Sequence, residues 1–221
     1  MKVPTRMRAF TIIELLVVTL LLLIFLLLLS PTFTQPGHRP NVMLRCVNNL
    51  REVAIAEIIW ADDHEGRLPQ QVSIEAGGSL ERIEAGSAAP HFEPLLPYAR
   101  SNVFVCPSDK KKQVFKAPAT FTDQNLSYFA AIDAQVLATN SGVRALAGDR
   151  HLEHRGVAVK PGLLVLAPGE PVGWTGEMHK TENSRRTVGV IAFADGHVEA
   201  KKDRFVPEPE HSAVTNRFAV P

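Results

Sequence analysis

Residues 10–29 read FTIIELLVVTLLLLIFLLLL, an apolar run in which Glu14 is the only charged side chain. An α-helix of about 20 apolar residues is long enough to cross the hydrocarbon core of a bilayer. A carboxylate within such a helix costs roughly 2.5–3.5 kcal/mol when it stays unpaired in lipid. We therefore predict a transmembrane helix over residues 10–30 in which Glu14 has a partner. The alternative is a plain membrane anchor whose Glu14 reaches the lipid headgroups.

The flanks of this run indicate its orientation. Lys2, Arg6 and Arg8 precede it without any acidic residue, and positive charge before an apolar segment keeps that end in the cytoplasm. A conventional signal peptide is cut after its apolar run, at small residues. Here the run ends in LLSPT over residues 28–32, which offers no Ala-x-Ala site.

Residues 8–18, RAFTIIELLVV, resemble the type IV prepilin cleavage and methylation signature, in which a short basic leader and a small residue precede Phe-Thr-Leu-Ile-Glu and a long apolar helix. The resemblance implies that prepilin peptidase removes a leader of residues 1–9 between Ala9 and Phe10, and that Phe10 is N-methylated. It also implies that Glu14 pairs with the amino terminus of a neighbouring subunit, and a buried carboxylate is tolerated when a cation meets it. Ala9 stands where the family usually has Gly, so we expect slower cleavage.

The rest of the chain has the size of one medium domain. Residues 41–221 of the 221-residue chain form the predicted globular domain, which is large enough for a hydrophobic core. The formal net charge of +1 gives no electrostatic reason to expect nucleic-acid binding. Pro31, Pro36 and Pro40 predict a helix break over residues 31–40, because proline removes a helix hydrogen bond.

A second helix is predicted from about Asn41 to Trp60, with Gly66 as its stop signal. Its apolar residues recur at spacings of three and four, which is typical of one helix face. These residues are Leu44, Val47, Leu50, Ala54 and Ile58.

Short strands are predicted after this helix. The apolar runs lie at residues 103–105, 126–131, 163–166 and 188–200. In the last run Asp195-Gly196 is flanked by apolar residues, a pattern that indicates a β-hairpin with a two-residue type I′ turn. A long helix followed by strands predicts an α+β fold.

Four further stretches resemble a pseudopilin-like family related to the major pseudopilin of type II secretion. They are CVNNLRE at residues 46–52, WADDHEGRLP at 60–69, FVCPSD at 104–109, and Met178-His179 with FADGHV at 193–198. The resemblance implies a pilin-like fold, in which the second helix packs on a small antiparallel sheet.

The chain contains two cysteines, Cys46 and Cys106. If the apolar helix places the domain outside the cytoplasm, both thiols meet an oxidising compartment. We predict a disulfide between them, which would be worth about 2–4 kcal/mol. The alternative is two buried free thiols.

Several histidines and acids could form a metal site. The residues are Asp149, His151, His154, His179, Asp195 and His197. Their spacing follows no zinc motif, and Asp195 has a sufficient structural role in its turn, so we expect no metal and no other cofactor. Calcium is the alternative that stays open, with oxygens from Asp149, Asp195 and Glu199.

Nucleophilic catalysis has little support, since the chain lacks a Gly-x-Ser-x-Gly elbow and a P-loop. A Cys106–His151 pair is the remaining candidate, and we expect no enzyme. We predict instead a pilin-like structural subunit of a pseudopilus or pilus in a type II secretion-like system. It would be a single-pass protein of the bacterial inner membrane with an extracytoplasmic domain. Its partners would be other pilin-like subunits, prepilin peptidase, the assembly platform and membrane lipid.

Two other functions stay open. One is a membrane-tethered enzyme or ligand-binding module. The other is a minor pilin whose residues 70–175 serve adhesion.

Overall fold

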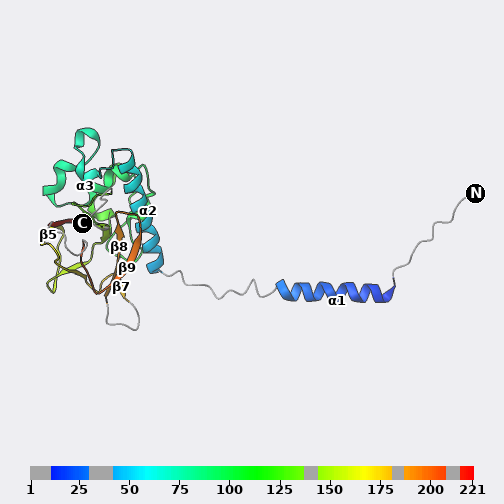
Figure 1. Ribbon diagram of the computed structural model, residues 1–221. Coiled ribbons are helices and arrows are strands. Elements are labelled where there is room, and N and C mark those ends of the chain that lie inside the picture. The colour runs from blue at the N-terminus through cyan, green and yellow to red at the C-terminus, as the bar shows by residue number, and fades with distance from the viewer. Residues whose placement is uncertain (1–10, 30–41, 137–143, 181–186, 208–214) are drawn as a thin grey trace, which may run out of the picture. The chain divides into compact units, whose positions relative to one another are not determined.

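The structure is a computed structural model that describes residues 11–29, 42–136, 144–180, 187–207 and 215–221 (Figure 1). The chain divides into two compact units, residues 1–40 and residues 41–221. The predicted leader, the cleavage residues Ala9 and Phe10, and the predicted break over residues 31–40 lie outside the described residues.

The first unit contains helix α1, Ile12–Leu29. The predicted helix is therefore present, and its side chains from Ile12 to Leu27 are exposed. Within the described ranges, no helix is long and apolar enough to span a membrane.

Helix α2, Val42–Asp62, begins the second unit. It ends as predicted near Gly66, which adopts a φ of 76° and donates its N–H to the carbonyl of Ala61 at 2.8 Å. The predicted face is buried apart from its first residue: Leu50 and Ala54 are fully buried and Val47 and Ile58 partly so, but Leu44 is 56% exposed. Cys46, which the predicted face did not include, is also fully buried and is bonded to Cys106.

Two antiparallel sheets follow α2, as an α+β fold requires. In the part of the chain that the structure describes, seven strands form one sheet in the order β5-β11-β1-β2-β8-β7, with β9 on β8. Four strands form the other, in the order β10-β6-β3-β4. The larger sheet consists of β1 Tyr128–Ala131, β2 Ala145–Asp149, β5 Gly162–Leu166, β7 His179–Lys180, β8 Thr187–Phe193, β9 Val198–Lys202 and β11 Asn216–Val220. The second consists of β3 Leu152–His154, β4 Val157–Ala158, β6 Val172–Trp174 and β10 Arg204–Phe205.

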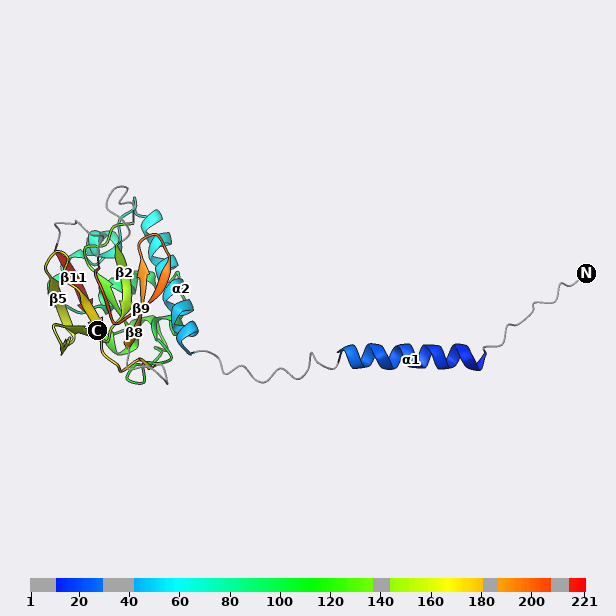
Figure 2. The ribbon, with the colours of Figure 1, turned by 60° about the horizontal axis from the view of Figure 1, so that its bottom comes forward.

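The core lies between α2 and the larger sheet. Helix α2 packs beside β8 and β9 (Figure 2), and Leu50 and Val53 of the helix are fully buried together with Val190 and Ile191 of β8. The two sheets meet where Trp174 of β6 lies against β8, with its ring stacked on Phe205 at 5.1 Å between centroids. One α helix and one extended sheet thus bury a shared apolar surface, and the sheet is larger than the small one predicted.

The remaining segments are mostly short helical turns between α2 and β1. They are η2 Pro69–Gln71, η3 Ile74–Ala76, η4 Leu80–Ala85, α3 Ala89–Phe92, η5 Glu93–Leu95, η6 Ser101–Phe104, η7 Pro118–Thr120 and η8 Asp123–Asn125.

The strand predicted at residues 103–105 is wrong, because this segment consists of the last two residues of η6, Val103 and Phe104, and of Val105, which follows it. Its carbonyl groups are satisfied by other partners: that of Val105 accepts from the Asn49 amide at 3.0 Å, and that of Phe104 accepts from the Ser127 N–H at 2.9 Å. The strands predicted near residues 126–131 and 163–166 are present as β1 and β5.

The hairpin predicted over residues 188–200 is present as β8 and β9, but the predicted turn type is wrong. The Phe193 carbonyl accepts the N–H of Gly196 at 2.8 Å, and the Phe193 N–H donates to His197. Gly196 has a φ of 85°, whereas Asp195 is not among the residues with positive φ. This is a three-residue loop with glycine in the left-handed position. The added residue lets the Asp195 carboxylate accept the His197 N–H at 3.0 Å.

Candidate functional site

The first candidate feature is the N-terminal turn of α1. Thr11 precedes the helix, and its hydroxyl accepts the N–H of Glu14 at 3.3 Å. In return, the Glu14 carboxylate accepts the Thr11 N–H and the Thr11 hydroxyl through Oε2, both at 2.9 Å. This reciprocal arrangement is a capping box, which satisfies backbone N–H groups that the helix leaves without partners.

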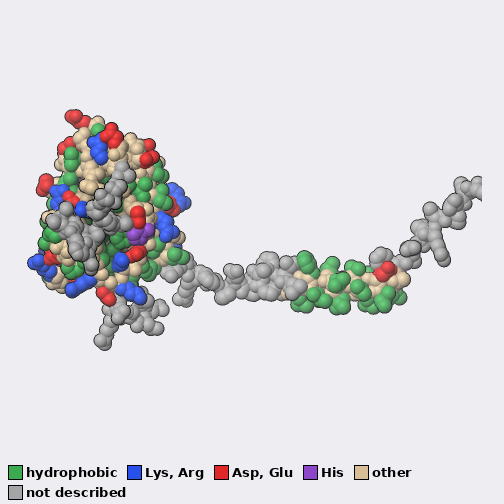
Figure 3. All heavy atoms as spheres, viewed as in Figure 1, with side chains coloured by type: hydrophobic (Ala, Val, Ile, Leu, Met, Phe, Trp, Pro, Cys, Tyr) green, Lys and Arg blue, Asp and Glu red, His purple; other side chains and the backbone are tan. Residues whose placement is uncertain are grey.

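The capping box gives Glu14 a local role that our sequence reasoning missed. The signal was readable, since Thr-x-x-Glu before an apolar run is the sequence pattern of this cap. Both local bonds use Oε2, and Oε1 takes part in none of the hydrogen bonds found among the described residues. The remaining visible surface of α1 is almost wholly apolar (Figure 3).

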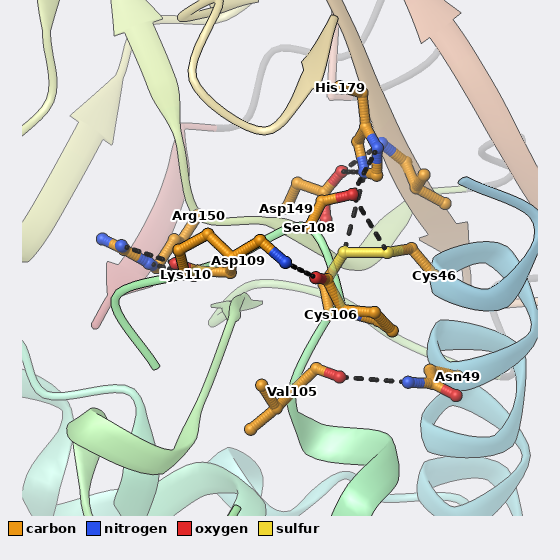
Figure 4. The surroundings of a disulfide bond; sticks show 12 residues. Cys46, Asn49, Val105, Cys106, Ser108, Asp109, Lys110, Asp149, Arg150 and His179 are labelled. Carbon is orange, nitrogen blue, oxygen red and sulfur yellow. Dashed lines mark hydrogen bonds and ion pairs between the residues drawn. A yellow bond between two sulfur atoms is a disulfide. The ribbon is translucent and has the colours of Figure 1, made fainter. Parts of the chain in front are cut away.

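The second candidate feature is the disulfide between Cys46 of α2 and Cys106, whose Cα atoms lie 5.0 Å apart (Figure 4). Both residues are fully buried. The bond ties α2 to the segment that follows η6, and the Asn49 amide reinforces the same contact through the Val105 carbonyl.

His179, from β7 at the edge of the larger sheet, lies directly beside the disulfide. Its Nε2 is 3.8 Å from Sγ of Cys106 and 3.2 Å from Oδ2 of Asp149, and its Nδ1 is 3.3 Å from the Ser108 hydroxyl. Asp149 Oδ2 also accepts the N–H of Val190 at 2.8 Å. We call Cys46, Cys106, Asp149 and His179 the disulfide cluster.

The disulfide cluster is buried and polar. Asp149 is 1% exposed, and its Oδ1 has no hydrogen-bond partner among the described residues. The hydroxyl of Tyr128, on the strand beside β2, is likewise buried without a partner in that part of the chain. Burial raises the pKa of Tyr128 well above its usual value, and the Asp149 and Asp109 carboxylates add to the effect.

A buried ion pair borders the disulfide cluster. Arg150 donates to both carboxylate oxygens of Asp109, at 2.7 and 3.2 Å. Burial by itself would raise the pKa of Asp109, but the Arg150 guanidinium, His151 and the Lys111 N–H outweigh it, so the pKa is lowered. This pair holds the Cys106–Asp109 turn against β2.

The histidines and acids that the sequence suggested as one metal cluster separate into pairs. Their partners are Asp149 for His179, Glu177 for His151 at 3.2 Å, Glu170 for His154 at 2.8 Å and Asp195 for His197 at 2.5 Å. The two glutamates were missed, because nothing in their spacing relates them to these histidines.

Asp149 lies apart from the other two residues considered for calcium. It ends β2 and binds Val190, whereas Asp195 follows Phe193, which pairs with Ala145 at the other end of β2. Asp195 and Glu199 both contact His197, and Glu199 also forms an ion pair with Lys201. The histidine beside Cys106 is His179, and not His151, the candidate partner that the sequence left open.

Two of the surface hollows that the described residues line lie elsewhere on the domain. One, of about 440 Å³, is lined in part by Arg217 and Asp133, which form a 2.7 Å ion pair with each other. The other, of about 350 Å³, includes Asp123, which already accepts the Ser87 hydroxyl and the Ala89 N–H. Because these charged groups already have partners within the chain, neither hollow indicates a reaction.

No protein-family model, curated protein or solved structure matches this chain.

Proposed function

We propose that this chain is a pilin-like structural subunit, which assembles through its N-terminal helix into a pseudopilus or pilus of a type II secretion-like system. Before assembly, the apolar segment from Phe10 to Leu29 would reside in the bacterial inner membrane with the globular domain on the extracytoplasmic side. Prepilin peptidase and an inner-membrane assembly platform would be its processing and assembly partners.

The observation that carries the proposal is an apolar helix whose side chains are exposed among the described residues of its unit. The large apolar side chains between Ile12 and Phe25 are 46–81% exposed, and Glu14 is the only charged residue among them. Soluble monomers rarely expose so extended an apolar surface, which calls for lipid or other protein to cover it. Identical helices packed side by side in a heterologous, open arrangement would cover it and form a filament.

Glu14 supports packing against copies of the same chain. An ordinary anchor gains nothing from a carboxylate in its apolar segment, which is costly when unpaired in lipid. In the isolated chain Thr11 occupies Oε2. Oε1 would then accept a hydrogen bond from the charged amino group of a neighbouring mature subunit that begins at Phe10. This ion pair would compensate the buried charge of Glu14.

The globular domain agrees with an extracytoplasmic location. A fully buried disulfide joins α2 to the chain sixty residues further on, and such bonds persist in oxidising compartments. The domain would lie on the outside of the filament.

The test separates the charge of Glu14 from its role in the capping box. Glu14→Gln keeps the cap, because glutamine also serves at this position, but removes the charge. Thr11→Ala keeps the charge and loses the cap, at a cost of about 0.5–2 kcal/mol in helix stability. Each variant is co-expressed with the assembly platform and prepilin peptidase, and sheared filaments are quantified by blotting.

We expect Glu14→Gln to enter membranes normally but to be lost from filaments, and Thr11→Ala to assemble at a reduced yield. Normal filament yield from Glu14→Gln, with a deficit only in Thr11→Ala, would show that the carboxylate is only a helix cap. Peptide mass analysis of the mature protein should find an N-methylated Phe10. A chain that begins beyond Ser30 would contradict prepilin processing.

A further inference from the structure

The disulfide cluster has the composition of a metal site as well as that of a covalent cross-link. Cys46 Sγ, Cys106 Sγ and a ring nitrogen of His179 all lie within 4.8 Å of one another, and all three residues are buried. Thiolate sulfur and imidazole nitrogen are the ligands that zinc prefers in proteins. We propose that the reduced form of this protein binds one thiophilic divalent cation, zinc, through Cys46, Cys106 and His179, with the Asp149 carboxylate completing the coordination.

Two distances between the proposed ligands are close to those of tetrahedral coordination. Bond lengths of about 2.3 Å to sulfur and about 2.0–2.2 Å to nitrogen and oxygen place neighbouring sulfur and nitrogen ligands about 3.6 Å apart, and nitrogen and oxygen ligands about 3.4 Å apart. The corresponding distances are 3.8 Å from Cys106 Sγ to His179 Nε2 and 3.2 Å from His179 Nε2 to Asp149 Oδ2. The main change required is that the two sulfurs separate to about 3.8 Å.

The surroundings also favour a cation. Asp149 is 1% exposed, and within the described residues its Oδ1 lacks a partner. A buried carboxylate with spare acceptor capacity is costly unless a cation or donor meets it. The Val190 N–H holds Oδ2 in place and the Ser108 hydroxyl lies at Nδ1 of His179, so both groups have the outer contacts that orient metal ligands.

The oxidised and metal-bound states exclude each other, because zinc requires the thiolates that the disulfide consumes. A dithiol reductant supplies two electrons and two protons to open the Cys46–Cys106 bond, and itself becomes a disulfide. Zinc then displaces one proton from each cysteine thiol, and both protons are released to solvent. The same two sulfurs would thus join α2 to the rest of the domain in either state, through a covalent bond or through the metal.

The experiment uses the full-length chain in detergent. A phosphine reduces the disulfide and is itself oxidised to a phosphine oxide, with oxygen from water. Mass analysis after alkylation verifies that both thiols have formed, with brief denaturant and refolding if the native protein resists reduction. Cobalt(II) is titrated as a spectroscopic probe, and zinc is then titrated in competition with a chromophoric chelator. The oxidised protein is measured in parallel.

We expect one cobalt per reduced chain, with a thiolate-to-cobalt charge-transfer band and the visible bands of tetrahedral cobalt, and neither in the oxidised protein. Asp149→Asn removes a proposed ligand and should lower zinc affinity by at least about 10–100-fold, the loss that outer groups alone cause at metal sites. His179→Ala should lower it further. The matched control is His197→Ala, which removes an exposed histidine from the hairpin turn and should leave affinity unchanged.

A second readout uses only the wild-type protein, so it does not depend on whether the variants fold. Zinc should slow alkylation of Cys46 and Cys106 in the reduced wild-type protein. If zinc gives no protection, or if reduced and oxidised protein bind the same amount of cobalt, the proposal is wrong. Equal zinc affinity in His179→Ala and the wild type would also overturn the assigned ligand set.

Discussion

Gly189 of β8 lies where the two sheets meet, and an alanine there should destabilise the domain. A Cβ at this position would lie 2.2, 2.3 and 2.4 Å from three carbons of the Trp174 indole. Carbon atoms in contact lie about 3.5–4.0 Å apart, so the ring would have to move by more than about 1 Å. Trp174 is 3% exposed and is stacked on Phe205, which leaves the ring little room.

The size of the effect follows from two opposing terms. Overpacking of a core costs about 1–3 kcal/mol, and this contact belongs at the upper end because three ring carbons are affected. Replacement of glycine by alanine returns about 0.4–1 kcal/mol through the unfolded chain. We expect a net loss of about 2 kcal/mol, which at a urea m-value of about 2 kcal/mol/M lowers the unfolding midpoint by about 1 M.

Equilibrium urea unfolding of the oxidised protein, followed by circular dichroism, measures the loss. Gly176→Ala is the matched control, because among the described residues its added Cβ would meet only Thr187 Cγ2, at 3.7 Å. A double-mutant cycle isolates the contact: in a Trp174→Ala background, Gly189→Ala should cost almost nothing. An equal loss in both backgrounds would refute the steric explanation.

Three further predictions concern stability. Burial lowers the pKa of His91 to about 4. Because the unfolded chain binds this proton from about pH 6.5 downward, the free energy of unfolding should fall between pH 6.5 and pH 4 by up to about 3 kcal/mol. His91→Gln should reduce this pH dependence in urea titrations. Reduction of the Cys46–Cys106 bond, which closes a loop with a sequence separation of 60, should cost about 2–4 kcal/mol; equal urea midpoints with and without reductant would contradict this. Gly196→Val should cost about 1–3 kcal/mol of stability, because Gly196 has positive φ and an added Cβ would lie 3.1 Å from Cδ1 of Ile58. Asp195→Asn keeps the hydrogen-bond acceptor of the turn and should leave the melting temperature nearly unchanged. If Asp195→Asn instead abolished a hydrolytic or metal-binding activity at constant melting temperature, the turn would have a catalytic or binding role.

Much of the secondary structure was predictable, because periodicity and stop signals act over a few neighbouring residues. Helix α1, helix α2 and the hairpin of β8 and β9 are present where the sequence predicted them. The errors occur where a distant partner decides the local conformation. Val103 and its neighbours have the composition of a strand, yet Asn49 and Ser127 satisfy the backbone there and leave a helical turn.

The candidate site was predictable only in part for the same reason. Cys46, Cys106 and Glu14 stood out by residue type and position, and the cap formed by Thr11 and Glu14 was also readable. That His179 lies beside the disulfide was not, because 73 residues separate it from Cys106.

An apolar N-terminal helix with a single carboxylate, a second helix with a defined end and a hairpin near the C-terminus could all be predicted from residue order, since each depends on adjacent side chains. Which histidine meets which acid depends on the folded sheet, because β2 and β7 each pair with β8. This pairing places Asp149 and His179 at the disulfide. It also left Asp149 buried with one oxygen unpaired among the described residues, a property that depends on what surrounds the residue in space and not on its neighbours in the chain.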